Sequence, residues 1–337
     1  MSVRLVGVVM LADIYGSVLS RVASRRMLAR SLALTVVVVA LSGCASVQSG
    51  NRRDMALLGP AELREQLTQQ PSVGPDWGLP KFADIGQLPL MQPSNDRDWS
   101  PDQAVLARAD FQGDQVTVHN IRNCTYRTAE DYTVDYYDKT FDLGTLDSVD
   151  FIVVPLPELP GVAHTMLSFG FGGRDYLAVS VEIRKEKGES YNPIKGILRQ
   201  YELMYVVGDE RDLIKLRTDC YLYDVYAYRA RATPAQVRAL FKDVMDRVNK
   251  LVEEPEFYDT IANNCTSNIA QHVNRLAPGK IPYDYRVLLP GYSDRLAYDL
   301  GLLETDVSFE ETKRRARVNQ LAYVYHDSPD FSAEIRR

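Results

Sequence analysis

"HTMLSFGFGGRDYLAVSVEIRKE", residues 164–186, carries the clearest structural signal in the chain. Apolar residues alternate with polar or small ones on both sides of residues 172–174, as in two strands joined by a tight turn. Alternation places one apolar set on a single face of the pair. That set is Leu167, Phe169, Phe171, Leu177, Val179, Val181 and Ile183. We therefore expect an antiparallel β-hairpin with this face in a core.

The same hairpin predicts a histidine beside a carboxylate. If the turn occupies residues 172–175, His164 lies opposite roughly residues 182–184, and the face match selects Glu182. Ser180 and Arg184 would be its neighbours on that face. A carboxylate opposite an imidazole fixes its tautomer and supports its charged form. The alternative is that Glu182 and Arg184 are solvent-facing charges on a half-exposed strand.

Two helices follow a series of strands in the sequence. Thr233 and Pro234 predict the start of a helix that runs to Glu254, and a second helix is expected from Asn264 to Leu276. Strands before them then give an α+β domain over residues 105–305. The other expected strands lie within residues 114–127, 148–159, 201–217 and 219–230, the second ending at a sheet edge because of Pro155 and Pro157.

"NNCTSNIAQHV", residues 263–273, is the candidate for chemistry. Asn264 is a favourable N-cap, so Cys265 would lie in the first helical turn, where the helix dipole lowers a thiol pKa. The Cys265 backbone N–H could also meet charge developing on a substrate carbonyl, with Asn263 and Asn264 as oxyanion neighbours. The alternative is an inert buried cysteine at a helix start.

A cysteine nucleophile needs a base within hydrogen-bonding distance. His272 is seven residues away along the helix, roughly 10 Å of rise, so we expect it to be a helix-surface residue. His326 lies near the C-terminus, and His119 lies on a strand where it could line a pocket. His164, with Glu182 opposite, is the preferred base.

Residues 1–43 have the features of a lipoprotein signal peptide. Arginines precede the apolar run "SLALTVVVVAL", residues 31–41, which is too short to span a bilayer stably. It ends in "LSGC", similar to a lipobox, so Cys44 is expected to carry a lipid. The alternatives are an ordinary signal peptide or a short membrane anchor, and translation could start at Met1 or Met27.

Two further segments complete the expected organisation. Residues 44–104 are interpreted as a tether and N-terminal arm, and residues 306–337 as a C-terminal tail. From Phe309 that tail would be a solvated helix or a loose end. Because Ala45 and not aspartate follows Cys44, an outer-membrane lipoprotein facing the periplasm is expected.

Charge and cysteine content limit the partners. The net charge is −6, and residues 1–43 hold five arginines and one aspartate, so a processed chain is more acidic still. This argues against nucleic acid and against a polybasic membrane patch. With Cys44 lipidated, an odd number of thiols remains, and the simplest hypothesis pairs Cys124 with Cys220 and leaves Cys265 free. No cysteine spacing indicates zinc, and we expect neither a metal nor a cofactor.

Several ordered blocks carry a family resemblance. A histidine on one strand, a polar residue on the next and "NC" at a helix start resemble the circularly permuted papain-like fold of the NlpC superfamily. The blocks are "VHNIRNCTYR", "AHTMLSFGF", "LAVSVEIRKEKGE", "YELMYVVGDERDLIKLR" and "FYDTIANNCTSNIAQHVN". Together they resemble the N-terminal periplasmic domain of Lnb, the lipoprotein N-acyltransferase, over residues 105–280.

The resemblance implies a papain-like fold with an antiparallel sheet packed on helices. It also implies Cys265 as nucleophile, His164 as base, Glu182 as third member and an acyl-enzyme route. Lnb continues into transmembrane helices, whereas no run after residue 44 is long and apolar enough to span a bilayer.

Three functions are therefore weighed. The first is a lipid-anchored, cysteine-dependent acyltransferase or hydrolase acting on a lipid or lipoprotein. The others are a cysteine amidase or peptidase acting on peptide or peptidoglycan, and a non-catalytic envelope lipoprotein that binds a partner. The acyl acceptor and the oligomeric state are left open.

Overall fold

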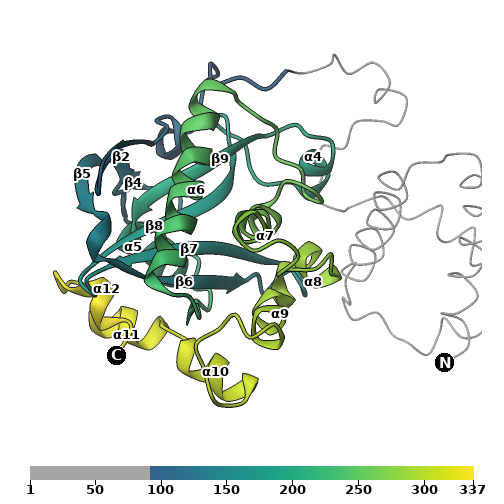
Figure 1. The fold of residues 1–337 in the computed structure, drawn as a ribbon. Coiled ribbons are helices and arrows are strands. Elements are labelled where there is room, and N and C mark those ends of the chain that lie inside the picture. Colours follow the sequence, from purple (N-terminus) through teal and green to yellow (C-terminus); the bar gives the residue numbers. More distant parts are fainter. Residues whose placement is uncertain (1–91) are drawn as a thin grey trace, which may run out of the picture. The chain divides into compact units, whose positions relative to one another are not determined.

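A computed structural model describes residues 92–337, and the expected signal peptide, the lipidation site at Cys44 and most of the tether lie outside these residues. An eight-stranded sheet dominates the described part (Figure 1). Its strand order is β1-β2-β9-β8-β7-β6-β10, with β5 paired to β2, and the pairings are antiparallel except for a parallel contact of β2 with β9. The strands are β1 (Arg108–Gln112), β2 (Gln115–Arg122), β5 (Tyr136–Asp142), β6 (Leu146–Pro155), β7 (Ala163–Phe171), β8 (Asp175–Arg184), β9 (Glu202–Asp209) and β10 (Tyr226–Arg229). A separate pair, β3 (Thr125–Tyr126) and β4 (Tyr132–Thr133), lies apart from this sheet.

Helices cover the sheet, which confirms an α+β domain with a large sheet packed on helices. Helix α6 (Pro234–Glu253) crosses the strands, and α7 (Cys265–Leu276) lies beside it (Figure 1). Thr233 caps α6 in a reciprocal capping box with Gln236, as the sequence predicts. The remaining helices are α4 (Pro193–Ile197), α5 (Glu210–Lys215), α8 (Tyr285–Leu288), α9 (Ser293–Asp299), α10 (Phe309–Ala316), α11 (Asn319–Val324) and α12 (Phe331–Glu334).

The predicted hairpin is present as β7 and β8. Its register pairs Phe171 with Asp175 and Met166 with Ser180, so it turns where the alternation predicts. The expected apolar face is buried in one core with α6. The opposite face is buried as well: Ser180 is fully buried and Arg184 is 2% exposed. The interpretation of a half-exposed strand is therefore wrong, because other elements cover this face.

Two strand predictions are wrong at their ends. Strand β9 ends at Asp209, whose side chain accepts a hydrogen bond from the Arg211 backbone N–H and starts α5. Residues 216–220 then form a π-helical turn instead of continuing a strand. Within residues 219–230 only β10 is extended. Side-chain capping by Asp209 outweighs the weak alternation that follows it.

Pro155 lies at the end of β6, as expected for an edge. Strand β10 pairs with β6 only from Asp150 to Val153, so the last residues of β6 have β7 on one side and no β10 on the other. A proline there costs no ladder hydrogen bond.

The C-terminal segment is not a loose end. Phe331 and Ile335 are buried against Ile152, Val154 and neighbouring residues of the sheet. Arg336 forms ion pairs with Asp150 on β6 and Glu210 at the start of α5. Helix α10 keeps the expected solvated face, with Arg314 and Arg315 among its exposed residues. A basic residue near the chain end thus meets carboxylates that are distant in sequence.

Arg336→Met is expected to destabilise the fold by about 3–5 kcal/mol, because it leaves the buried carboxylate of Glu210 without its cation. It also removes one of the two arginines that pair with buried Asp150, which keeps Arg229. Urea unfolding measures the loss. Arg337→Met is the matched control, since that exposed side chain forms an ion pair with Glu334 at the surface, and it should cost about 0–1 kcal/mol. Equal losses in the two variants would contradict the buried ion-pair account.

No helix among residues 92–337 is long and apolar enough to cross a membrane. Residues 92–104 run along the domain, where Trp99 is buried under the Arg184 guanidinium and pairs with Glu186.

Candidate active site

Cys265 is the first residue of α7 and is 6% exposed. Asn264 caps the helix: its side chain accepts from the Ser267 N–H at 2.8 Å, and its own N–H donates to Ser267 Oγ at 2.9 Å. The predicted N-cap is therefore confirmed. The capped first turn puts the thiol at the positive end of the helix dipole, which favours a thiolate.

His164 lies at the start of β7, beside two residues of β8. His164 Nε2 is 2.6 Å from Ser180 Oγ and 3.3 Å from Glu182 Oε1. Ser180 Oγ also donates to Glu182 Oε1 at 2.6 Å. The hairpin register therefore brings together the histidine, hydroxyl and carboxylate that alternation predicts.

Charge interactions link this group to the thiol. Burial disfavours a charged imidazole, but the Glu182 charge and hydrogen bonding with Cys265 and Glu182 outweigh it and raise the pKa of His164 to about 9. Burial likewise disfavours a thiolate, but hydrogen bonding and charge from His164, with help from Thr165, lower the pKa of Cys265 to about 7. Burial would also raise the pKa of Glu182, yet His164 and Arg217 hold it well below its usual range. Between pH 7 and 9 a thiolate–imidazolium pair is thus favoured.

The asparagines before Cys265 are engaged in the turn itself. The Asn263 amide donates to Phe257 O and accepts from Asn268 Nδ2, while the Asn264 amide donates to Thr260 O. Their side chains are therefore committed to shaping the turn. The backbone N–H of Cys265 is the better oxyanion donor of the group.

His272 is buried and not a helix-surface residue, so that expectation is wrong. It is 1% exposed because its face of α7 packs toward α6 and β9, where Nδ1 contacts Asp243 and Nε2 contacts Tyr205 OH at 2.8 Å. Burial lowers the pKa of His272 to about 4 despite the Asp243 hydrogen bond. Tyr205 OH also donates to Asn268 Oδ1 at 2.9 Å. The conclusion that His272 is no partner for Cys265 stands, but it supports the turn through Tyr205 and Asn268.

The other two histidines lie elsewhere. His119, on β2, has its ring nitrogens beside Asp138 and Asp110 on the neighbouring strands. His326, near the C-terminus, contacts Asp219 and Asp327. The structure therefore places neither with the Cys265 group.

The predicted disulfide between Cys124 and Cys220 is absent: both are free thiols, as is Cys265. The Cys124 N–H donates to Asp212 in a buried ion-pair network, whereas Cys220 ends the π-helical turn beside Asp219. Burial raises the pKa of Cys124 to about 11, and that of Cys220 is raised too. The odd number of thiols in the sequence gives no information on these separate surroundings.

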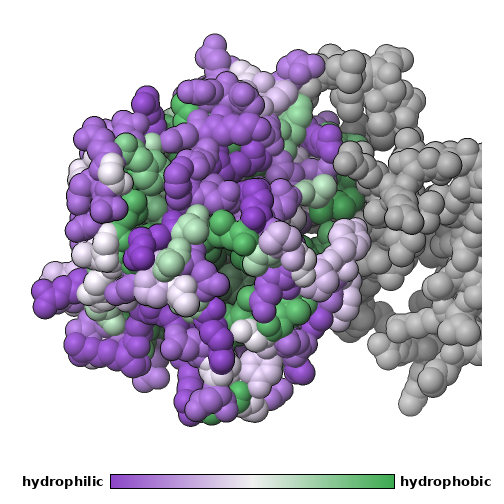
Figure 2. Space-filling view, viewed as in Figure 1, coloured by the Kyte–Doolittle hydropathy of each residue, from purple (hydrophilic) through white to green (hydrophobic). Residues whose placement is uncertain are grey.

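Two tyrosines lie near the Cys265 thiol. Burial raises the pKa of Tyr191 to about 12, and both Tyr191 and Tyr258 interact electrostatically with the Cys265 thiol. Tyr292 packs on Gly161, three residues before His164, where the backbone has φ +84° and a neighbouring hydrogen bond joins Gly291 N–H to Gly161 O. In the space-filling view the surface is mostly hydrophilic, with hydrophobic patches around a hollow near the centre of this face (Figure 2).

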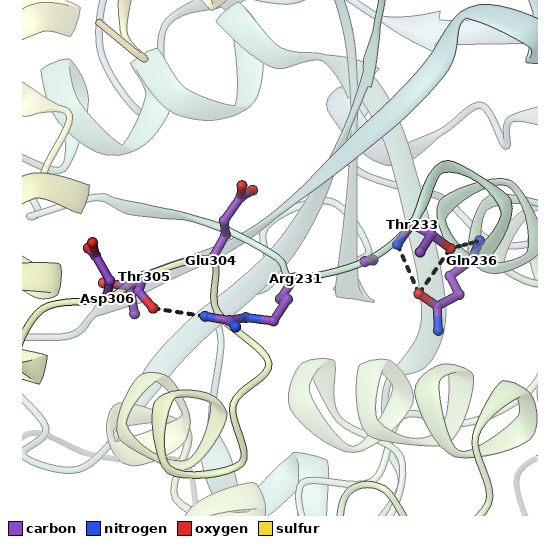
Figure 3. Close-up of a pocket in the computed structure, with 7 residues that line it drawn as sticks. Arg231, Thr233, Gln236, Glu304, Thr305 and Asp306 are labelled. Carbon is purple, nitrogen blue, oxygen red and sulfur yellow. Dashed lines mark hydrogen bonds between the residues drawn. The ribbon is translucent and has the colours of Figure 1, made fainter.

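A separate open pocket lies at the start of α6 (Figure 3). Arg231, Thr233, Gln236, Glu304 and Asp306 line it, and none belongs to the Cys265 group. Three of its lining residues serve local structure: Arg231 donates to Thr305 O, and Thr233 and Gln236 form the helix cap. Among residues 92–337 no cluster of three or more His, Cys, Asp or Glu side chains is arranged to hold a metal ion.

Arg217 is the residue that sequence reasoning missed. It lies in the π-helical turn after α5, is buried, and donates to Glu182 Oε1 at 2.8 Å. Its position depends on a rare π-helical turn, which no residue pattern in the sequence predicts.

A comparison with known protein families gives a match over the middle of the chain. The family model described as the Lnb N-terminal periplasmic domain matches residues 132–291, a range that contains His164, Glu182, Arg217 and Cys265. No curated protein and no solved structure matches the chain. Through residues 132–291, the chain belongs to the Lnb N-terminal periplasmic domain family.

Proposed function

We propose that this protein is a cysteine-dependent acyltransferase or hydrolase of the bacterial envelope, on a circularly permuted papain-like fold. One observation carries the proposal. The Cys265 thiol, at the N-terminus of α7, has a lowered pKa because it interacts with His164, and His164 in turn contacts the Glu182 carboxylate. Cys265 acts as nucleophile, His164 as base and acid, and Glu182 orients the imidazole.

The reaction has two halves. The Cys265 thiolate attacks an acyl carbonyl, and the charge that develops on its oxygen meets the Cys265 backbone N–H. The tetrahedral intermediate collapses as the His164 imidazolium protonates the leaving group, which leaves a thioester. An amine or water then loses its proton to neutral His164 and attacks the thioester, and the thiolate departs as the product forms.

A lipid or lipoprotein is the proposed source of the acyl group. The aromatic residues that interact with the Cys265 thiol, Tyr191 and Tyr258, suit an acyl chain better than a peptide backbone, which needs polar partners. The lipobox-like segment supports attachment through a lipid on Cys44 to the periplasmic face of the outer membrane.

The pH dependence of thiol alkylation tests the nucleophile. The rate for Cys265, followed by mass spectrometry of its peptide, should rise with a midpoint near pH 7, two units below the ordinary value of 9.0. Cys124 and Cys220 are internal controls, because the pKa of each is raised. A Cys265 midpoint at or above pH 9 would remove it as the nucleophile.

A further inference from the structure

Arg217 occupies an unusual place for a buried cation. Residues 216–220 form a π-helical turn, and π-helical turns are frequent at functional sites. One guanidinium nitrogen donates to Leu213 O at 3.0 Å, within the preceding helix, and the other reaches Glu182 on β8. One nitrogen of the guanidinium is thus held by α5, and the other faces the Glu182 carboxylate.

One oxygen of the Glu182 carboxylate has three polar neighbours. Glu182 Oε1 accepts from Ser180 Oγ at 2.6 Å and from Arg217 at 2.8 Å, and lies 3.3 Å from His164 Nε2. The Glu182 side chain is still 22% exposed. A carboxylate with access to water gains hydration by turning outward, so contact with His164 requires something that holds it inward.

We propose that Arg217 is the positioning residue of this site, whose guanidinium holds the Glu182 carboxylate against His164. The inference rests on the proposed function and adds a fourth member to the Cys265–His164–Glu182 group. The fork geometry of arginine suits this task, because it donates from two directions at once to Leu213 O and to Glu182.

The groups that face this carboxylate all bear on the test. His164 faces it from β7, Ser180 from β8 and Arg217 from the π-helical turn, while Tyr221 and Tyr258 interact with it electrostatically. If Arg217 acts by holding Glu182, its effect on the thiol must vanish when Glu182 has no charge. If it acts as a nearby cation or as a structural tie, its effect persists without that charge.

The experiment is a double-mutant cycle read through the pH midpoint of Cys265 alkylation. Arg217→Met, Glu182→Gln and the double variant are compared with the parent in the full chain. Arg217→Met should raise the midpoint by about one pH unit, and Glu182→Gln by at least as much. The double variant should match Glu182→Gln alone. Arg217→Lys keeps one donor and should recover more than half of the shift.

Controls separate positioning from folding and from the proposed function. Lys215→Met removes a cation two residues away and should leave the midpoint unchanged, and thermal unfolding reports whether each variant is folded. Equal shifts from Arg217→Met with and without Glu182→Gln would overturn the proposal, as would an unchanged midpoint in folded Arg217→Met. If Glu182→Gln itself has no effect, both this inference and the third member of the proposed site are wrong. If Arg217→Met does not fold, Arg217→Lys is carried through the same cycle.

Discussion

Replacement of Cys265 by alanine is expected to lower acyl transfer by roughly 10⁴-fold or more and to abolish the covalent intermediate. The thiolate supplies the electron pair for the new bond, and the alanine side chain has none. Hydrolysis of a p-nitrophenyl acyl ester measures turnover, and intact mass spectrometry after quenching in acid measures the thioester.

The two other thiols of the domain provide matched controls. Cys124→Ser and Cys220→Ser should keep turnover, because both side chains lie outside the Cys265 group and both have a raised pKa. An acyl adduct that persists in Cys265→Ala, or that disappears in Cys220→Ser, would assign the nucleophile elsewhere.

His164→Ala is expected to lower turnover by roughly 10²–10⁴-fold, the usual contribution of a general acid–base group. In the parent, the rate should rise as the Cys265 thiol ionises near pH 7 and fall as the His164 imidazolium loses its proton near pH 9. The raised pKa of His164 means that its charged form is stabilised below pH 9 and that this stabilisation is lost above it.

Glu182→Gln narrows that pH window from both sides. Without the carboxylate charge, the pKa of His164 falls toward its ordinary 6.5 and that of Cys265 rises toward 9.0. The pH range in which the thiolate–imidazolium pair is favoured therefore shrinks. We expect turnover at pH 8 to drop by roughly 10²-fold or more. His326→Ala is the control, since that exposed ring contacts only Asp219 and Asp327 among its ionisable neighbours. A bell-shaped profile unchanged in Glu182→Gln would contradict its orienting role.

Local patterns predicted the parts of the site that lie within one hairpin or one helix start. The β7–β8 register follows from where the alternation turns, and it brings His164 to Glu182 at 3.3 Å. Capping by Asn264 follows from its side-chain chemistry. These features depend on residues close in sequence, whose spacing the backbone geometry alone sets.

Predictions failed where distant segments meet. Residue His272 has the spacing of a helix-surface position, yet contacts with Asp243 and Tyr205 bury it. Cysteine parity suggested a bridge between Cys124 and Cys220, but each thiol packs in surroundings that other segments build. Charge near the C-terminus suggested a solvated tail, but Arg336 forms ion pairs with Asp150 on β6 and Glu210 on α5.

By itself, the sequence determined the two long helices, the hairpin register and the capped cysteine, because periodicity and capping act over a few residues. Only the tertiary structure decided that Arg217 reaches Glu182 and that both faces of the β7–β8 hairpin are largely buried. It also brought Cys265 Sγ to 4.0 Å from the Ala163 carbonyl oxygen, next to His164 and 102 residues away in sequence. Such contacts depend on how complete elements pack, and the free energy of that packing is spread over the whole domain.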